Sequence, residues 1–379
     1  IQGAEHLNFY SVYPVHSHSA TFSHLVPCNC DGCRLSAANR NYGTGRHDMP
    51  ANISFQNSKA EAFTSLTPAW WDRKGEYVAD QHLTSKQVWG KRGVLNFEYE
   101  LRPISDAKTG MKLDSYRHCI RKDTGVTVGF GMTDGYRIVQ PRQAFDFLDD
   151  LMRDGVMRYA SAGVLGKGEE IWILGVIPND DQPIYGETHN RYVLWTDRFD
   201  GGGTLKCFPC VTRVECANTL AVALSEWNAK LFKGIRHSGD MQAKLDAARQ
   251  TLVEVETAFQ KYNADCQKLI SARFNRDDAR QFIETLLPML NDDASQRSKS
   301  IRERKVQAVR EAMRDETNNL GEMKGTWYQL ANAVTFAIDH GNVLHFRGDQ
   351  RTNRFRSLMM NDGANLKRKA FDLALNMAS

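Results

Sequence analysis

A succession of short β-branched and aromatic runs, separated by turn sequences, constrains the fold of this chain more than any other feature. Two of the turns are Lys122-Asp-Thr-Gly125 and Asp200-Gly-Gly-Gly203, which suit tight connections between neighbouring strands. Strands joined by tight turns pair antiparallel, whereas parallel strands need long crossovers. We therefore expect an α+β protein with a mainly antiparallel sheet. The expected strands are 96–104, 115–121, 126–130, 136–139, 157–165, 170–177, 192–196 and 204–214.

Helices are expected at three places within this strand-rich region. Residues 84–89 carry a short helix signal, with a threonine and a serine available as caps. Pro141 suits the first position of a helix that runs to about residue 153, because its missing N–H would have no helical partner there. A third helix, 218–227, would close the region. These helices would pack against the sheet.

After residue 240 the hydrophobic pattern changes from strand-like to helical. Apolar residues from Met241 to Leu269 keep a 4-3 spacing over about four heptads, which predicts one long helix. Such a helix either packs across its own domain or forms a subunit contact in a ring or filament, and the sequence leaves both open. Further helices are expected at 275–290, 298–314, 326–339 and 365–377.

The composition is that of a globular protein, with 41% hydrophobic and 25% charged residues in a chain of 379. We expect three regions: a loop-rich arm with cysteines and histidines at 1–50, an α+β sheet core at 51–238, and a helical region with basic segments at 239–379. No apolar run is long enough to cross a bilayer, so we expect no membrane contact. Eight cysteines in 379 residues are too few for a disulfide scaffold, so we expect a reducing cytoplasmic location.

The arm contains the one candidate metal site. His24, Cys28, Cys30 and Cys33 could supply four zinc ligands, because thiolate and imidazole suit tetrahedral zinc. The alternative is a set of free thiols on the arm. Cys207-Phe-Pro-Cys210 lies on an expected strand end without the βαβ context of a redox motif, and we interpret these two cysteines as structural.

Basic charge is concentrated towards the C-terminus. The net charge is +4, but the segment from Arg297 to Lys369 holds 15 Lys/Arg against 8 Asp/Glu, so the remainder is slightly acidic. Such a segment could hold a phosphate backbone or could be a solvated helix face. The sequence contains no G-x-S-x-G or H-E-x-x-H motif. We therefore expect no enzymatic activity and no required cofactor.

Cations at expected strand ends and turns are the strongest candidates for a binding site. An arginine fork beside amide and hydroxyl groups suits phosphate, and aromatic rings between cations suit single-stranded nucleic acid. Arg213 before the Asn218-Thr219 pair is the clearest example. The predicted nucleic-acid-binding residues are Arg121, Lys122, Tyr136, Arg137, Arg142, Lys167, Arg213, Asn218, Thr219, Arg236 and His237.

Several motifs between about Phe63 and Met377 are specific when taken together. They are Pro68-Ala69-Trp70, Gly129-Phe-Gly-Met-Thr-Asp-Gly-Tyr136-Arg-Ile-Val-Gln140, Phe145-Asp-Phe-Leu148, Tyr159-Ala-Ser-Ala-Gly163, Arg213-Val-Glu-Cys-Ala-Asn218-Thr219-Leu220, Ile235-Arg236-His237-Ser238, Asn332-Ala-Val-Thr335 and Asp339-His340. In this combination the chain resembles the phage/plasmid-like proteins that contain domain of unknown function 932. Trp71 stands where the family usually has His, and the arm before residue 50 lies outside the resemblance.

This resemblance implies an origin in a phage or plasmid and a bacterial host cytoplasm. A strand-rich core followed by helices is similar, at the level of fold analogy, to single-strand annealing recombinases. We therefore expect an oligomeric protein, a ring or filament, that binds and anneals single-stranded DNA. The alternative is a non-enzymatic structural or regulatory phage protein that assembles through its long helix and binds no DNA.

Overall fold

The computed structural model divides the chain into two compact units, Ile1–His47 and Asp48–Ser379. All described residues belong to the second unit. The predicted zinc ligands, His24, Cys28, Cys30 and Cys33, lie outside them. The structure describes residues 53–57, 59–65, 77–79, 81–91, 93–151, 157–177, 189–213, 219–221, 234–252, 255–315, 321–341, 357–358 and 362–379.

A seven-stranded sheet forms the centre of the described unit, and it is antiparallel at every neighbouring pair except β3–β4. Its strands follow the order β12-β11-β10-β9-β8-β3-β4. The expected mainly antiparallel α+β fold is therefore confirmed. The bounds are β3 (Ala62–Ser65), β4 (Tyr77–Ala79), β8 (Arg158–Leu165), β9 (Glu170–Val176), β10 (His189–Arg198), β11 (Lys206–Arg213) and β12 (Thr219–Ala221); β1 (Phe55–Gln56) and β2 (Lys59–Ala60) pair separately.

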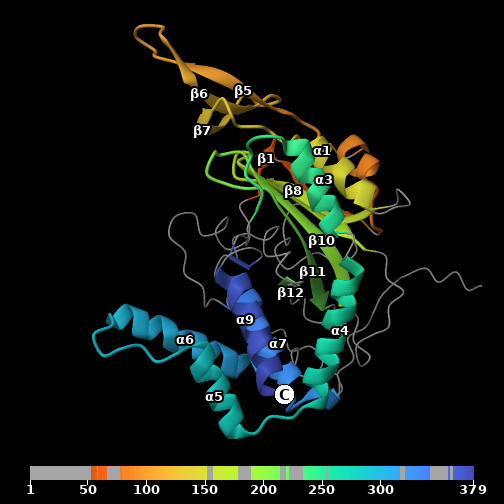
Figure 1. Ribbon diagram of the computed structural model, residues 1–379, viewed down its shortest axis with the longest axis vertical. Coiled ribbons are helices and arrows are strands. Elements are labelled where there is room, and N and C mark those ends of the chain that lie inside the picture. Colours follow the sequence, from red (N-terminus) through yellow and green to blue (C-terminus); the bar gives the residue numbers. More distant parts are fainter. Residues whose placement is uncertain are drawn as a thin grey trace, which may run out of the picture. The chain divides into compact units, whose positions relative to one another are not determined.

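A second, smaller sheet consists of β5 (Tyr99–Ser105), β6 (Lys112–Arg121) and β7 (Thr127–Thr133), in that order and all antiparallel. Figure 1 shows these strands together, with the β5–β6 connection at their far end. The register of β6 shifts against both neighbours, which marks bulges in the sheet. Because bulges bend strands and redirect side chains, they influence which residues of this sheet face solvent.

Helices cover the main sheet on the face that carries Trp195 and Cys207. The ring of Phe147, in α1 (Pro141–Leu151), lies 4.9 Å from that of Trp195. Helix α3 (Met241–Leu252) packs beside α1 (Figure 1), and its Arg249 pairs with Asp150 of α1 at 2.9 Å. The opposite face has its own buried cluster, which includes Trp172 and Phe208. Both faces are thus apolar, as the near-continuous hydrophobic runs of β8 and β9 require.

The α-helices after α3 pack on one another, and α7 (Trp327–His340) and α9 (Asp362–Met377) also pack on the edge strand β12 (Figure 1). Aromatic rings contact one another between these helices. The ring centroids of Phe282 and Trp327 are 6.0 Å apart, and those of Tyr262 and Phe371 are 5.6 Å apart. Phe282, Trp327 and Tyr262 belong to one buried core, on which Phe371 packs. This core also contains residues of α1 and of the main sheet, so it crosses the predicted boundary at residue 238. The other helices of this group are α4 (Val255–Ser271), α5 (Arg276–Leu286) and α6 (Gln296–Ala312); the short helices are η1 (Gln87–Lys91) and η3 (Gly321–Met323).

The heptad segment forms two helices, α3 and α4, with residues 253–254 between them outside the described part of the chain. One continuous helix therefore stays a prediction. The stripe itself is covered within this chain: Leu245, Phe259 and Cys266 are buried in the common core. Side chains that already pack against their own domain are not available for a subunit contact, so the structure favours the first of the two expected roles.

Two expected elements are wrong where the structure describes them. Residues 136–139 form no strand, because Tyr136 makes an isolated bridge with Ser238 instead of joining a sheet. Thr219–Ala221, expected to begin a helix, forms β12 because its backbone pairs with Cys210–Thr212 of β11. Tertiary pairing overrides local helix propensity here. No helix among the described residues combines the length and apolar character that a membrane crossing requires.

Candidate functional site

Two motif segments about one hundred positions apart meet in the structure. The backbone N–H of Arg137 donates to the carbonyl of His237 at 2.9 Å, and Tyr136 bridges Ser238. We call residues 136–138 and 235–238 the motif junction. It brings together four predicted site residues, of which Arg137 and Arg236 are exposed and Tyr136 and His237 are buried. The junction therefore presents two guanidinium groups above an interior formed by two rings.

His237 and Asp197 form a buried pair that anchors the motif junction. Nδ1 of His237 lies 3.0 Å from the carbonyl oxygen of Arg137, and Nε2 lies 2.7 Å from Oδ1 of Asp197. A carbonyl oxygen only accepts, so Nδ1 carries a hydrogen and a second proton lies between Nε2 and the carboxylate. The Tyr136 ring stacks on His237 at 4.9 Å. Both imidazole nitrogens are committed, so His237 has no free nitrogen to act as a general base or to contact a phosphate.

Burial and hydrogen bonding together retain the proton that lies between His237 and Asp197. Burial alone would lower the pKa of His237, but its bonds to Asp197 and to the Arg137 carbonyl outweigh burial and raise that pKa. Burial raises the pKa of Asp197. Both shifts favour keeping one proton on the pair in the folded state.

The free energy of unfolding is expected to fall as pH rises above neutrality. Unfolded His237 releases its proton near its usual pKa of about 6.5, whereas the folded pair retains it. The stabilisation is thus complete below pH 6.5 and is lost as pH rises towards the folded pKa, with a slope of at most ~1.4 kcal/mol per pH unit.

Urea unfolding of the wild type and of His237→Gln between pH 6 and 9 measures this effect. The difference between the two proteins should shrink with rising pH. His118→Gln is the control, since His118 is only half-buried and has no carboxylate partner among the described residues. Parallel pH profiles for wild type and His237→Gln would contradict the assigned proton.

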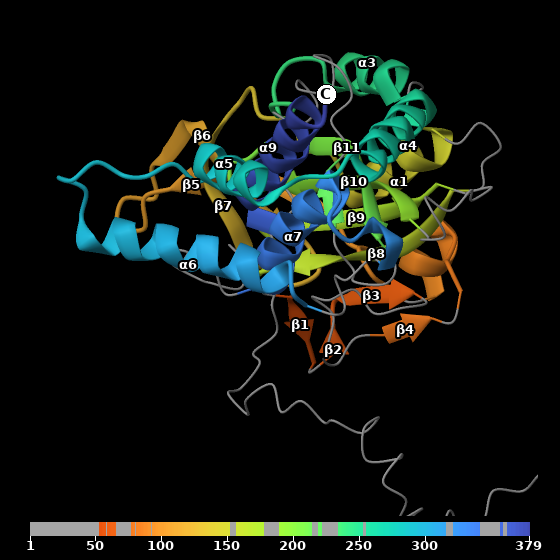
Figure 2. The ribbon, with the colours of Figure 1, turned by 90° about the horizontal axis from the view of Figure 1, so that it is seen from below.

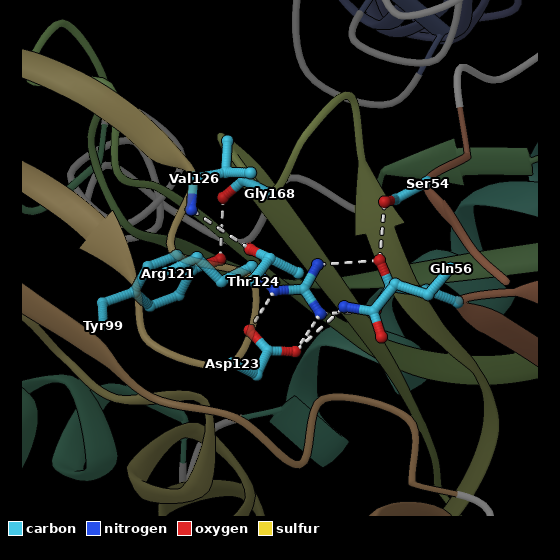
Figure 3. A network of polar contacts seen from close by, with 9 residues as sticks. Ser54, Gln56, Tyr99, Arg121, Asp123, Thr124, Val126 and Gly168 are labelled. Carbon is cyan, nitrogen blue, oxygen red and sulfur yellow. Dashed lines mark hydrogen bonds and ion pairs between the residues drawn. The ribbon is translucent and has the colours of Figure 1, made fainter.

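Arg121, also predicted to bind phosphate, lies in a buried ion-pair network (Figure 3). Its side chain is 1% exposed; Nη1 donates to Glu61 Oε2 at 2.7 Å, and Nε and Nη2 donate to Asp123 at 2.8 Å. Burial alone would lower the pKa of this guanidinium, but Glu61 and Asp123 raise it above its ordinary value. The group also lies 3.7 Å from the centre of the Phe97 ring. Arg121 is thus a structural cation that ties the turn after β6 to the residue before β3, and it is not available to a ligand.

The other predicted residues are scattered. Lys122 pairs with Glu98 at 2.7 Å, and Arg142 covers the Trp89 ring at 3.5 Å while pairing with Asp146. Lys167 is exposed at the β8–β9 turn and has no carboxylate partner in the described part of the chain. Arg213 ends β11 and Thr219 begins β12, so their backbones lie close, but Asn218 falls outside the described residues. Those predicted residues whose side chains the structure describes therefore do not form one track.

Exposed aromatic and apolar side chains gather on the small sheet, and none of them is among the predicted nucleic-acid-binding residues. Of the seven large hydrophobic residues exposed among the described residues, three lie on its strands and a fourth lies directly before β6, so the apolar surface is concentrated rather than dispersed. Phe130 is 69% and Tyr116 48% exposed; the other two are Met111 and Leu113. We call β5, β6 and β7 with these side chains the platform. Concentrated exposed apolar surface marks an interaction site.

Cations accompany the rings of the platform. Arg102 of β5 lies directly opposite His118 of β6, so the two share a face, and the His118 ring lies 6.3 Å from that of Phe130. Arg102 pairs with Glu100, and Arg117 pairs with Asp134 at 2.9 Å. Exposed pairs of this kind contribute little and can exchange for a ligand anion. Thr133, opposite Tyr116, is four residues before Arg137, which connects the platform to the motif junction along the chain.

The Gly129-Phe130-Gly131 motif explains why Phe130 faces outward. A Cβ on Gly129 would lie 2.3 Å from the carbonyl oxygen of Phe199 and 2.7 Å from Cα of Asp200, so only glycine permits this approach of β7 to the end of the main sheet. Gly131 has φ of +73°, a left-handed value that favours glycine. The sequence therefore contained a signal for the exposed ring, namely an aromatic residue with a glycine on each side.

Metal and redox chemistry receive no support within the described region. No group of three or more His, Cys, Asp or Glu there is arranged to hold a metal ion. Cys207 and Cys210 are buried free thiols in separate clusters on the two faces of the sheet, and burial raises the pKa of Cys210 to about 12. A protonated, inaccessible thiol is neither a nucleophile nor a ligand. The structural interpretation of this pair agrees with the structure.

The comparisons with known proteins give one result. The profile of the family described as Domain of unknown function (DUF932) matches residues 131–359, which is more than half of the chain. The chain belongs to this family. Its matched region begins at Gly131 and includes the motif junction and the buried Asp197, whereas most of the platform precedes it. The comparison with curated proteins and the comparison with solved structures each gave no match.

Proposed function

We propose that this DUF932 protein binds single-stranded DNA on its platform and supports annealing of complementary strands in phage or plasmid recombination. The observation that carries the proposal is the exposure of Phe130 and Tyr116 on a small open sheet with arginines on its surface. Base–aromatic stacking is tolerant of sequence because every base has a π face. Arginines beside such rings contact the phosphates between stacked bases.

The motif junction extends the same surface. Arg137 and Arg236 are exposed there, and the Nη1 atom of Arg137 donates to the carbonyl oxygens of Asp134 and Tyr136, at 2.6 and 3.1 Å. Such bonds leave the guanidinium with free donors. The proposed binding surface retains three exposed residues of the predicted set, Arg137, Arg236 and Lys167. The buried residues Arg121, Tyr136 and His237 act instead as supports.

Annealing in this proposal needs no bond making and no nucleotide cofactor. Cations reduce repulsion between two strands, and rings on one side of a base leave its pairing edge open. Oligomerisation into a ring or filament, and a place in the cytoplasm of a bacterial host, belong to the same proposal. Because the heptad stripe is buried within its own chain, assembly through that stripe without DNA is less favoured.

Replacement of the two rings should weaken single-strand binding strongly. Each base–aromatic stack contributes about 1–3 kcal/mol, so Phe130→Ala should raise the dissociation constant by roughly 5- to 150-fold, and Tyr116→Ala should act similarly. Both side chains are exposed, so folding should be retained. Fluorescence anisotropy with a labelled mixed-sequence oligonucleotide, at fixed salt, measures the change.

Phe55→Ala is the matched control, because Phe55 is 47% exposed on β1, which is not a strand of the platform. Wild-type affinity should also fall steeply with salt as counterions are released. Equal losses in Phe55→Ala and Phe130→Ala would reject the platform as the binding surface. Affinity that is insensitive to salt would reject phosphate contact altogether.

A further inference from the structure

Helix α6 presents a cationic surface that the proposed site does not use. Among residues 296–312 there are six Lys/Arg and two Glu, and Figure 2 shows the helix along its length. Its apolar residues Val306, Val309 and Ala312 are buried, which fixes the rotation of the helix about its axis. Ser295 caps the N-terminus by accepting from the N–H of Ser298 at 3.2 Å. The opposite face is therefore held towards solvent.

Three exposed arginines of this helix have no carboxylate partner among the described residues, a property they share with Arg137 and Arg236 of the motif junction. Arg102, Arg142 and Arg280 are exposed and each pairs with a carboxylate. On α6, by contrast, Arg297, Arg304 and Arg310 are exposed, and no carboxylate of the described residues pairs with them. Uncompensated cations on one rigid helix repel one another, and an external polyanion would relieve that repulsion.

We infer that α6 binds the phosphate backbone of double-stranded nucleic acid. Arg297 and Arg310 are separated by thirteen residues, or about 20 Å along a helix. A duplex presents one charge per ~1.7 Å of its axis, so several phosphates lie within that length. Helix α6 contains no aromatic residue, and hence no surface on which an unpaired base could stack. Cations without rings fit a duplex, whose bases are already stacked on one another.

This inference rests on the proposed function in one respect, since a duplex is the product of annealing. The two sites have different roles, because the platform holds unpaired bases and α6 holds the backbone of the paired product. A protein with both sites would keep the new duplex bound while single strands remain on the platform.

The test uses the full-length protein with a blunt 20-base-pair DNA duplex and, separately, a 20-nucleotide single strand. The triple variant R297Q/R304Q/R310Q removes three exposed charges. Its duplex dissociation constant should rise roughly tenfold or more, and the slope of log K against log salt should decrease by up to ~0.9 per lost contact. The variant K86Q/K268Q/K324Q is the matched control, because it removes three exposed lysines from other elements.

The outcomes of this test distinguish duplex binding by α6 from single-strand binding by the platform. Weaker duplex binding by the α6 variant, with near-wild-type binding of the single strand, supports the inference. Equal losses in the α6 variant and the lysine control, unchanged duplex affinity, or no duplex binding by the wild type would overturn it. Phe130→Ala assayed with the single strand reports on the proposed function separately, so either claim can fail alone.

Discussion

Arg121→Met should lower the free energy of unfolding by about 3–5 kcal/mol, the largest effect expected for any single exchange discussed above. The replacement keeps much of the side-chain volume but leaves Glu61, at 13% exposure, without its bidentate partner. An unpaired carboxylate in such a place has lost both water and its counter-charge. Loss of Arg121 destabilises Asp123 less than Glu61, because the Asp123 side chain is 34% exposed to solvent. Urea unfolding followed by circular dichroism measures the loss.

Arg121→Met should also weaken DNA binding, because the Arg121 network joins the platform to the main sheet. Arg121 is the last residue of β6, and Tyr99 of β5 donates from its hydroxyl to the carbonyl of Gly168 at 2.7 Å in the β8–β9 turn. For the stability measurement, Arg102→Met is the control: that arginine is 55% exposed, and loss of an exposed pair should cost about 1 kcal/mol or less. A loss for Arg121→Met as small as the control's would show that the network is not structural.

Gly129→Ala should cost about 2–3 kcal/mol, towards the upper end of the overpacking range. The new methyl group would collide with Phe199 and Asp200 at backbone atoms, which cannot rotate away as a side chain can. The strand must then move, and Phe130 with it, so DNA affinity should fall together with stability. Both quantities are measurable on one preparation.

Gly135→Ala is the matched control for this exchange. Gly135 lies in the turn after β7, and the nearest atom to an added Cβ would be Thr133 Oγ1 at 3.7 Å, an ordinary contact. Its stability should change by less than about 1 kcal/mol, in either direction. If both alanine variants behaved alike, the close approach of β7 to the 199–200 backbone would not limit this position.

Local sequence patterns predicted most of the fold. The turns at 122–125 and 200–203 correctly placed the β6–β7 and β10–β11 pairs, and Pro141 correctly marked the start of α1. Turn chemistry and helix caps depend on neighbours in sequence, so they can be interpreted from sequence alone. The predictions for residues 136–139 and 219–221 were wrong because backbone partners distant in sequence decide their conformation.

The candidate site was predicted only in part, for a similar reason. Arg121, Tyr136 and His237 have the chemistry of phosphate and base contacts, but partners 40 to 62 residues away in sequence hold them in the interior. Arg137 and Arg236 are exposed, as a phosphate contact requires, and their proximity depends on a long-range backbone pairing. Phe130 and Tyr116 were not selected because exposure of a ring on a bulged strand depends on register, which sequence specifies weakly.

The most direct test of the central claim is ultraviolet cross-linking of a single-stranded oligonucleotide to the full-length protein, followed by mass spectrometry of the joined peptides. If the platform holds the bases, the cross-links should concentrate on residues 112–133, with Phe130 and Tyr116 as the attachment points. Cross-links confined to other described segments, or unchanged in yield when both rings are replaced by alanine, would contradict it.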